Sequence, residues 1–227
     1  MKINDFSAVI FDMDGVFIDT EVLVFDIFRQ VFAPYNIELS DEYQYKFIGQ
    51  PFSSNLVDIR QDFGIEFDSE AMRIQFDSTY EKVLTTSELD VQHGVKEIVQ
   101  LTQQHQLKRG LCTTSTRQQV NTIFNVVKTP SFDPFSIFQT VVTGDSVNNR
   151  KPHPEPYLTA AHNLQVQPHE CLVIEDSLSG IQSAKAAGCF CVALRHPYSQ
   201  HLDFSIADEE IDSLIQLLNS IKSDKSS

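Results

Sequence analysis

Positive charge is scarce in this sequence. Its 227 residues include 17 Lys and Arg against 31 Asp and Glu, which gives a formal net charge of −14. Proteins that bind nucleic acid or anionic membranes rely on basic surface that displaces counterions. We therefore expect neither partner for this chain. A small phosphorylated metabolite needs only one or two well-placed positive groups, so the charge balance does not exclude it as a partner.

The cysteines and histidines lack the spacings of common metal and redox motifs. No CxxC pair occurs among the four cysteines, which are Cys112, Cys171, Cys189 and Cys191. Three of them lie in apolar runs, where free cysteine usually packs as a small hydrophobic residue, so we expect buried, inert thiols. The seven histidines show no HExxH pattern. We expect them to be surface or helix-capping residues.

Long apolar stretches are also missing. No segment reaches the apolar length that a membrane span requires. The N-terminal MKINDF has no basic region followed by a long apolar run, as a secretory signal would have. We therefore expect a cytoplasmic protein, and a monomer rather than a stable oligomer.

Short apolar runs alternate with helical patterns along most of the chain. The runs that we predict as strands are 8–11, 110–112, 138–142, 171–174 and 190–194. Between them, apolar residues recur at helical spacing, as at Val95, Ile98, Val99 and Leu101. This alternation predicts an α/β fold, with a Rossmann-like parallel sheet flanked by helices on both faces.

One block interrupts the alternation. Residues 21–90 contain no convincing strand but carry helical patterns at 22–32, 41–47, 53–63 and 69–83. We therefore predict an α/β core of residues 1–19 and 93–227, with an all-helical cap domain of residues 20–92 inserted after the first strand. Ligands of open parallel sheets bind at the carboxyl ends of the strands, so we expect the insert to act as a lid. Its two connections are either hinges or ordinary loops.

The stretch AVIFDMDGVFIDT, residues 8–20, ends a predicted strand in two acidic residues. Asp12 and Asp14 are separated by one residue, and carboxylates this close require a cation or a proton between them. A carboxylate beside a hard divalent ion can act as a nucleophile, and a partly protonated neighbour can act as general acid and base. Such acid pairs also occur in turns and on surfaces, so other parts of the chain must decide.

Polar residues follow later strands of the predicted sheet. The hydroxyl run at 113–116 follows the second strand and is either an anion site or a stabilising helix cap. Glu175 and Asp176 follow the strand at 171–174. Lys151 precedes a proline that restricts the backbone, and it either neutralises phosphoryl charge or lies in a solvated loop.

The combination of these motifs resembles the haloacid dehalogenase superfamily over essentially the whole chain. Phosphatases of that superfamily carry DxDG(V/T)xxD(S/T), a Ser or Thr that ends the second strand, a Lys-Pro, and an (E/D)D that ends the fourth core strand. This sequence has all four motifs in that order. The resemblance implies a magnesium-dependent phosphomonoesterase that hydrolyses a small phosphorylated metabolite, such as a sugar phosphate, through an aspartyl-phosphate.

The resemblance also implies catalytic and metal-binding roles. Asp12 matches the nucleophile, Asp14 matches the acid and base, and Lys151 matches the cation that stabilises the developing charge. Asp12, Asp176 and the main-chain carbonyl of Asp14 match the ligands of Mg²⁺. Glu175 is either a further ligand or a residue that supports the ligands.

The resemblance identifies the residues that contact phosphate and substrate less specifically. Thr113 matches the hydroxyl that holds the phosphoryl group, and Thr114 and Ser115 are weaker candidates. Gln50 of the helical insert either hydrogen-bonds a substrate hydroxyl or lies in a solvated loop.

The insert looks like the small cap of phosphoglycolate phosphatase, β-phosphoglucomutase and hexose-phosphate phosphatase relatives. At the places where β-phosphoglucomutase has a histidine and a cap arginine, this chain has Val24 and Phe52. The difference favours a phosphatase over a sugar-phosphate mutase, which we keep as the alternative. A non-catalytic ligand-binding member is the third hypothesis, although no motif residue is lost.

Overall fold

A computed structural model describes residues 2–47, 52–86 and 89–223 of the chain. The chain divides into two compact units, one of residues Met1–Asp19 and Leu89–Ser227 and the other of residues Thr20–Glu88. The described part of the first unit contains the sheet, and that of the second contains helices alone. The predicted insert included residues 89–92, whereas these residues lie with the sheet unit.

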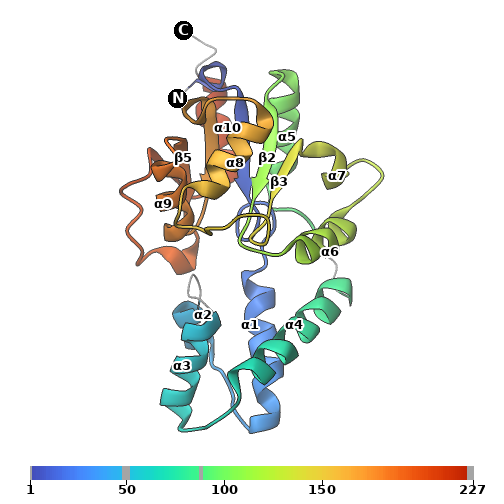
Figure 1. Cartoon of the computed structure of the whole chain (residues 1–227), viewed down its shortest axis with the longest axis vertical. Coiled ribbons are helices and arrows are strands. Elements are labelled where there is room, and N and C mark those ends of the chain that lie inside the picture. Colours follow the sequence, from blue (N-terminus) through green and yellow to red (C-terminus); the bar gives the residue numbers. More distant parts are fainter. Residues whose placement is uncertain (1, 48–51, 87–88, 224–227) are drawn as a thin grey trace. The chain divides into compact units, whose positions relative to one another are not determined.

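Six strands form the sheet of the first unit (Figure 1). They are β1 (Ala8–Asp12), β2 (Lys108–Cys112), β3 (Thr140–Val142), β4 (Cys171–Glu175), β5 (Phe190–Leu194) and β6 (Glu209–Ile211). The spatial order is β3-β2-β1-β4-β5-β6, and all neighbours run parallel. β1 and β4 are buried along their whole length, as central strands are when helices cover both faces. The predicted α/β fold is confirmed.

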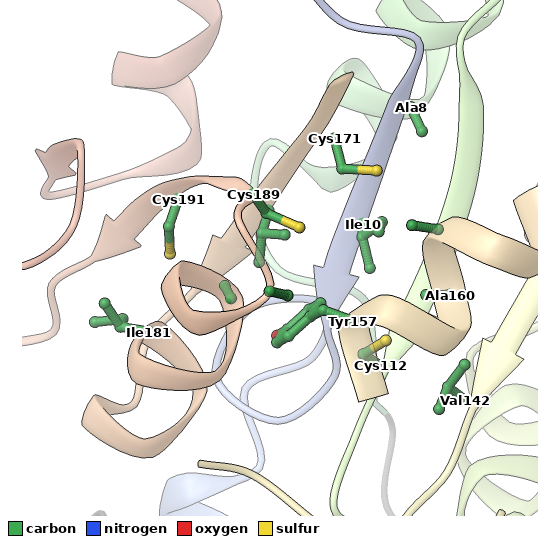
Figure 2. Packing of buried hydrophobic residues seen from close by; sticks show 14 of the residues in the cluster. Ala8, Ile10, Cys112, Val142, Tyr157, Ala160, Cys171, Ile181, Cys189 and Cys191 are labelled. Atoms are coloured by element: carbon green, nitrogen blue, oxygen red, sulfur yellow. The ribbon is translucent and has the colours of Figure 1, made fainter. Parts of the chain in front are cut away.

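Helices of the same unit flank the sheet. They are α5 (Val95–Gln104), α6 (Arg117–Val127), α7 (Pro134–Ile137), α8 (Glu155–Leu164), α9 (Leu178–Ala186) and α10 (Leu214–Ser223), with the 3₁₀ helices η1 (Ile3–Asp5), η3 (Pro168–Glu170) and η4 (Pro197–Ser199). α8 packs on β2 and β3, and α9 packs on β4 and β5. Together α8 and α9 cover a buried cluster that includes Ile10, Val173 and Tyr157 (Figure 2).

The four cysteines all have buried, unpaired thiols, as the sequence predicts. Figure 2 shows them among the apolar side chains of the cluster between the sheet and α8 and α9. Burial raises the pKa of the Cys112 and Cys191 thiols well above the ordinary value. A thiol that stays protonated is a poor nucleophile and metal ligand, which agrees with a packing role.

The second unit is built from helices around aromatic side chains. Its elements are α1 (Glu21–Phe32), η2 (Ala33–Tyr35), α2 (Asp41–Phe47), α3 (Phe52–Phe63) and α4 (Ser69–Thr86). The ring of Phe28 lies 5.1 Å from that of Phe47, 5.5 Å from that of Phe52 and 4.9 Å from that of Phe76, measured between centroids. Rings at such separations add pair energy to their large buried area. Gln50 lies outside the described residues.

Some elements differ from the sequence prediction. β3 begins at Thr140 rather than residue 138, because α7 precedes it. β6 and α10 were not predicted; Ile221 of α10 is only 2% exposed and packs within the core of the sheet unit. β6 is only three residues long and carries two charged residues, so it shows no apolar run. α10 does have apolar residues at helical spacing, at positions 214, 217, 218 and 221, and the prediction did not use them. No described helix has the length and apolarity to cross a membrane.

Gly94 lies where α5 and α10 approach each other closely. It caps α5 at a φ of +101°, and a Cβ there would lie 2.7 Å from Leu214 Cβ. We expect Gly94→Ala to lower the free energy of unfolding by on the order of 2 to 4 kcal/mol, from overpacking plus left-handed strain. Gly188→Ala is the control: its φ is +82° with nothing near the added Cβ, and it should lose only about 1 kcal/mol. Equal losses in chemical denaturation would contradict this view of the packing.

Candidate active site

The strand register brings the acidic and hydroxyl residues together. In the parallel pairing of β1 with β2, Asp12 lies opposite Cys112, so Thr113 follows at the same edge. Phe11 pairs with Ile174 of β4, which places Glu175 and Asp176 at that edge too. The strand order changes direction between β1 and β4, and carboxyl ends at such a switch point are where open α/β sheets bind ligands.

A tight turn follows β1 and requires glycine. Gly15 has a φ of +82°, and its amide donates to the carbonyl of Ile18 at 2.7 Å. A Cβ on Gly15 would lie 1.8 Å from Asp176 Oδ2. Any larger residue would therefore displace the Asp176 carboxylate, which explains why glycine follows the second aspartate.

Lys151 lies between two carboxylates in the interior. Its Nζ donates to Asp12 Oδ1, to Glu175 Oε1 at 2.5 Å and to the carbonyl of Cys112 at 3.1 Å, and its side chain is 2% exposed. Burial alone would lower the pKa of Lys151, but the carboxylates of Asp12 and Glu175 outweigh it and raise that pKa above the ordinary value. The ammonium group therefore stays charged.

The loop that carries Lys151 is held by hydrogen bonds from α8 and α9. Glu155, at the start of α8, accepts from the amides of Asn148 and Asn149 at 2.7 and 3.0 Å. Ser183 Oγ of α9 donates to the carbonyl of His153 at 2.6 Å. Lys151 therefore belongs to an anchored loop rather than to the solvated loop that the sequence left open.

Glu175 is fully buried and surrounded by donors. Besides Lys151, its Oε1 accepts from the hydroxyl of Tyr157 at 2.7 Å. Its Oε2 accepts from the amides of Asp176 and Ser177, each at 3.1 Å, and from Ser177 Oγ at 3.0 Å. With five donors on one carboxylate, Glu175 anchors the ammonium group of Lys151.

The hydroxyl side chains that follow β2 make different contacts. Thr116 caps α6 in a capping box with Gln119, so it serves the helix. Ser115 Oγ donates to Asp14 Oδ2 at 3.1 Å, and Thr113 Oγ1 lies 3.5 Å from the same oxygen. Thr114 is exposed. Thr113 and Ser115 thus face Asp14, with Ser115 the nearer, while the helix-capping role belongs to Thr116.

Three carboxylates form a compact group. Asp12, Glu175 and Asp176 each offer an oxygen, and these oxygens lie within 4.8 Å of one another. Burial is the main reason why the pKa of Asp12 lies well above its usual value; Lys151 opposes the rise and the neighbouring acids add to it. Burial, followed by repulsion from Glu175, likewise raises the pKa of Asp176. Buried oxygen ligands with excess negative charge fit a hard divalent cation.

Sequence reasoning missed three residues of this site, which are Gln92, Tyr157 and His196. Gln92 Nε2 and His196 Nε2 both bond the carbonyl of Gly15, at 3.1 and 2.9 Å. The expectation that the histidines lie on the surface or at helix ends holds only in part for His196, which is the N-cap of η4 but is buried in the site. It follows β5 by two residues, so the strand-end rule could have found it.

Known proteins resemble this chain over most of its length. The sequence profile described as "Haloacid dehalogenase-like hydrolase" matches residues 9–194. "Phosphorylated carbohydrates phosphatase" of Thermotoga maritima is 32% identical over 182 residues, 80% of this chain and 82% of that protein. "Protein CbbY" of Rhodobacter capsulatus is 28% identical over 216 residues, 92% of this chain and 94% of that protein.

A solved structure shares the fold. The crystal structure of CbbY from Rhodobacter sphaeroides in complex with phosphate has a TM-score of 0.77 at 22% identity, and the match covers 93% of this chain and 96% of that one. At this identity the likeness shows the fold alone.

The raised pKa of Asp176 predicts that Asp176→Asn raises the thermal stability of the metal-free protein by an amount that depends on pH. When folding raises the pKa of a group, that group stabilises the folded protein at pH values below its unfolded-state pKa. This stabilisation disappears as the pH rises through the folded-state pKa. Neutral Asn avoids that loss. We therefore expect metal-free Asp176→Asn to melt above the metal-free wild type at neutral pH, by on the order of 3 °C.

The gain should shrink as the pH falls toward the ordinary aspartate pKa of about 4. Thermal melts in a chelator over this pH range test it, with Asp5→Asn as the control because Asp5 is exposed. A lower melting temperature for Asp176→Asn at neutral pH would show that the carboxylate is stabilised in the folded protein.

Proposed function

Because the chain belongs to the haloacid dehalogenase-like hydrolase family and is a phosphatase of phosphate monoesters, we propose a specific reaction for it. It hydrolyses a small phosphorylated metabolite, a sugar phosphate or a similar compound, through an aspartyl-phosphate and with Mg²⁺. The observation that carries the proposal is the buried Lys151 held between Asp12 and Glu175, beside Asp14 and Asp176.

Asp12 is the nucleophile in this proposal. Its carboxylate oxygen attacks the phosphorus of the substrate, and the bond from phosphorus to the ester oxygen breaks. Asp14 gives its proton to that leaving oxygen, which departs as an alcohol. Water then attacks the phosphorus of the aspartyl-phosphate, Asp14 takes the proton of this water, and inorganic phosphate leaves with the Asp12 carboxylate restored.

Positive and hydrogen-bonding groups surround the reacting atoms. The ammonium group of Lys151 orients Asp12 and offsets the charge that develops on the phosphoryl oxygens. Thr113 and Ser115 lie next to Asp14 and offer hydroxyls to the phosphoryl group, with Thr114 as a further candidate. The Ser115 bond to Asp14 holds the acid at the place from which it reaches the leaving oxygen.

The carboxylates of Asp12 and Asp176 and the main-chain carbonyl of Asp14 would hold Mg²⁺. The ion supplies positive charge that neutralises the carboxylates and the phosphoryl group. Glu175 already accepts five hydrogen bonds, from Lys151, Tyr157, Asp176 and Ser177. We therefore assign it to holding Lys151 rather than to the ion.

Phosphate release tests the proposal. The panel comprises sugar phosphates, phosphoglycolate, nucleotides and an aryl phosphate, each with and without Mg²⁺. We expect release that depends on Mg²⁺, highest for sugar phosphates, and reduced by at least about a thousandfold in Asp12→Asn, because an amide is a poor nucleophile. The control is Asp5→Asn, an exposed aspartate changed in the same way.

Three results would contradict the proposal, in whole or in part. Isomerised sugar phosphate with little free phosphate would indicate a mutase. No turnover of any compound, in folded protein that binds Mg²⁺, would indicate a non-catalytic ligand-binding protein. Full turnover by Asp12→Asn would remove Asp12 as nucleophile while leaving the phosphatase activity in place.

A further inference from the structure

His196 contacts two strand-end loops of the site, yet the proposed reaction gives it no task. It lies two residues beyond β5, and its side chain is 10% exposed. Its Nε2 lies 2.9 Å from the carbonyl oxygen of Gly15 and 3.5 Å from Asp176 Oδ2. One imidazole therefore joins the loops that follow β1, β4 and β5.

The hydrogen bonds of His196 define its tautomer. A carbonyl oxygen only accepts, so the bond to Gly15 requires a proton on Nε2. His196 is also the N-cap of η4, and its main-chain carbonyl accepts from the amide of Ser199 at 3.0 Å. Ser199 Oγ in turn accepts from the His196 amide at 3.0 Å. The Nε2–H therefore donates to Gly15, and Asp176 Oδ2 lies 3.5 Å from the same nitrogen.

The Gly15 turn has little freedom to move. Its Cα lies so close to Asp176 that an added Cβ would approach Oδ2 to 1.8 Å. Its carbonyl accepts from Gln92 Nε2 at 3.1 Å as well as from His196. A shift of this carbonyl would move the neighbouring Asp14 peptide, and loss of the imidazole would remove the polar group that lies 3.5 Å from Asp176 Oδ2.

We propose that His196 is a positioning residue that holds Asp176 and the Asp14–Gly15 turn at the spacing a divalent cation requires. It touches neither substrate nor reacting atoms, and it acts by setting the affinity for Mg²⁺. The inference rests on the proposed function, since the ion is part of that function. Residues that orient metal ligands typically change metal affinity by about 10- to 100-fold when they are replaced.

Two substitutions separate this role from capping of η4. Asparagine at 196 keeps the main-chain hydrogen bonds with Ser199 but has no donor that reaches Gly15. Glutamine keeps the same main-chain bonds and extends an amide N–H toward the position of Nε2. His162→Asn is the matched control, because His162 of α8 is exposed.

The measurement is Mg²⁺ binding to the full chain by calorimetry, without substrate, together with the rise in Tm that Mg²⁺ produces. We expect His196→Asn to weaken Mg²⁺ binding by about tenfold or more. His196→Gln should stay closer to the wild type, and His162→Asn should match it. At saturating Mg²⁺, kcat of His196→Asn should recover toward the wild-type value while the Mg²⁺ concentration for half-maximal rate stays raised.

Separate outcomes distinguish the inference from the proposed function. Wild-type Mg²⁺ affinity in His196→Asn, with phosphatase activity of the wild type intact, overturns the inference alone. A wild type that neither binds Mg²⁺ nor depends on it overturns both. If His196→Asn fails to fold, ¹⁵N NMR of the wild-type histidines still decides: a proton on Nε2 of His196 is expected, and an Nε2 without a proton overturns the inference.

Discussion

One buried ammonium group fixes the arrangement of the site. Lys151 bonds Asp12, Glu175 and the carbonyl of Cys112, and thus ties the ends of β1, β2 and β4 to the loop before α8. Removing one partner from a buried ion pair leaves an uncompensated charge and typically costs about 3 to 5 kcal/mol. The positions of both carboxylates therefore depend on Lys151, and its own charge depends on them.

The same charges explain why the site favours a further cation. Four acids crowd one sheet edge, namely Asp12, Asp14, Glu175 and Asp176, and one lysine cannot neutralise them. Burial, together with the neighbouring acids, raises the pKa values of Asp12 and Asp176, so their charged forms are unfavourable without a further cation. Functional sites commonly keep such destabilising groups because their chemistry requires them. In our proposal, Mg²⁺ and a proton on Asp14 neutralise the remaining negative charge.

Sequence patterns predict the residues that follow strands directly. Asp12, Thr113, Glu175 and Asp176 each lie at a strand end, so an apolar run followed by a polar residue identifies them. Lys151 is different, because its position depends on hydrogen bonds that Glu155 and Ser183 make to an irregular loop. No periodic pattern encodes those bonds, and the resemblance to a family, rather than spacing, identified Lys151.

Other features depend on tertiary contacts that no local pattern contains. Tyr157 has the spacing of a core residue on α8, and its hydroxyl contact with Glu175 arises only when α8 packs on the sheet. Whether Thr113 or Ser115 lies nearer to Asp14 depends on the loop geometry after β2. The fold class required less information, because alternating apolar runs and helical segments already specify a parallel sheet.

The central claim is that Asp12 becomes phosphorylated, and rapid-quench mass spectrometry tests it directly. The Asp14→Asn variant, which lacks the base for the second half of the reaction, is mixed with an aryl phosphate and Mg²⁺ and then quenched in acid. The account predicts that the peptide containing Asp12 gains the mass of one phosphoryl group, and that Asp12→Asn does not. Rapid release of the aryl alcohol with no modified peptide in any sample would contradict it.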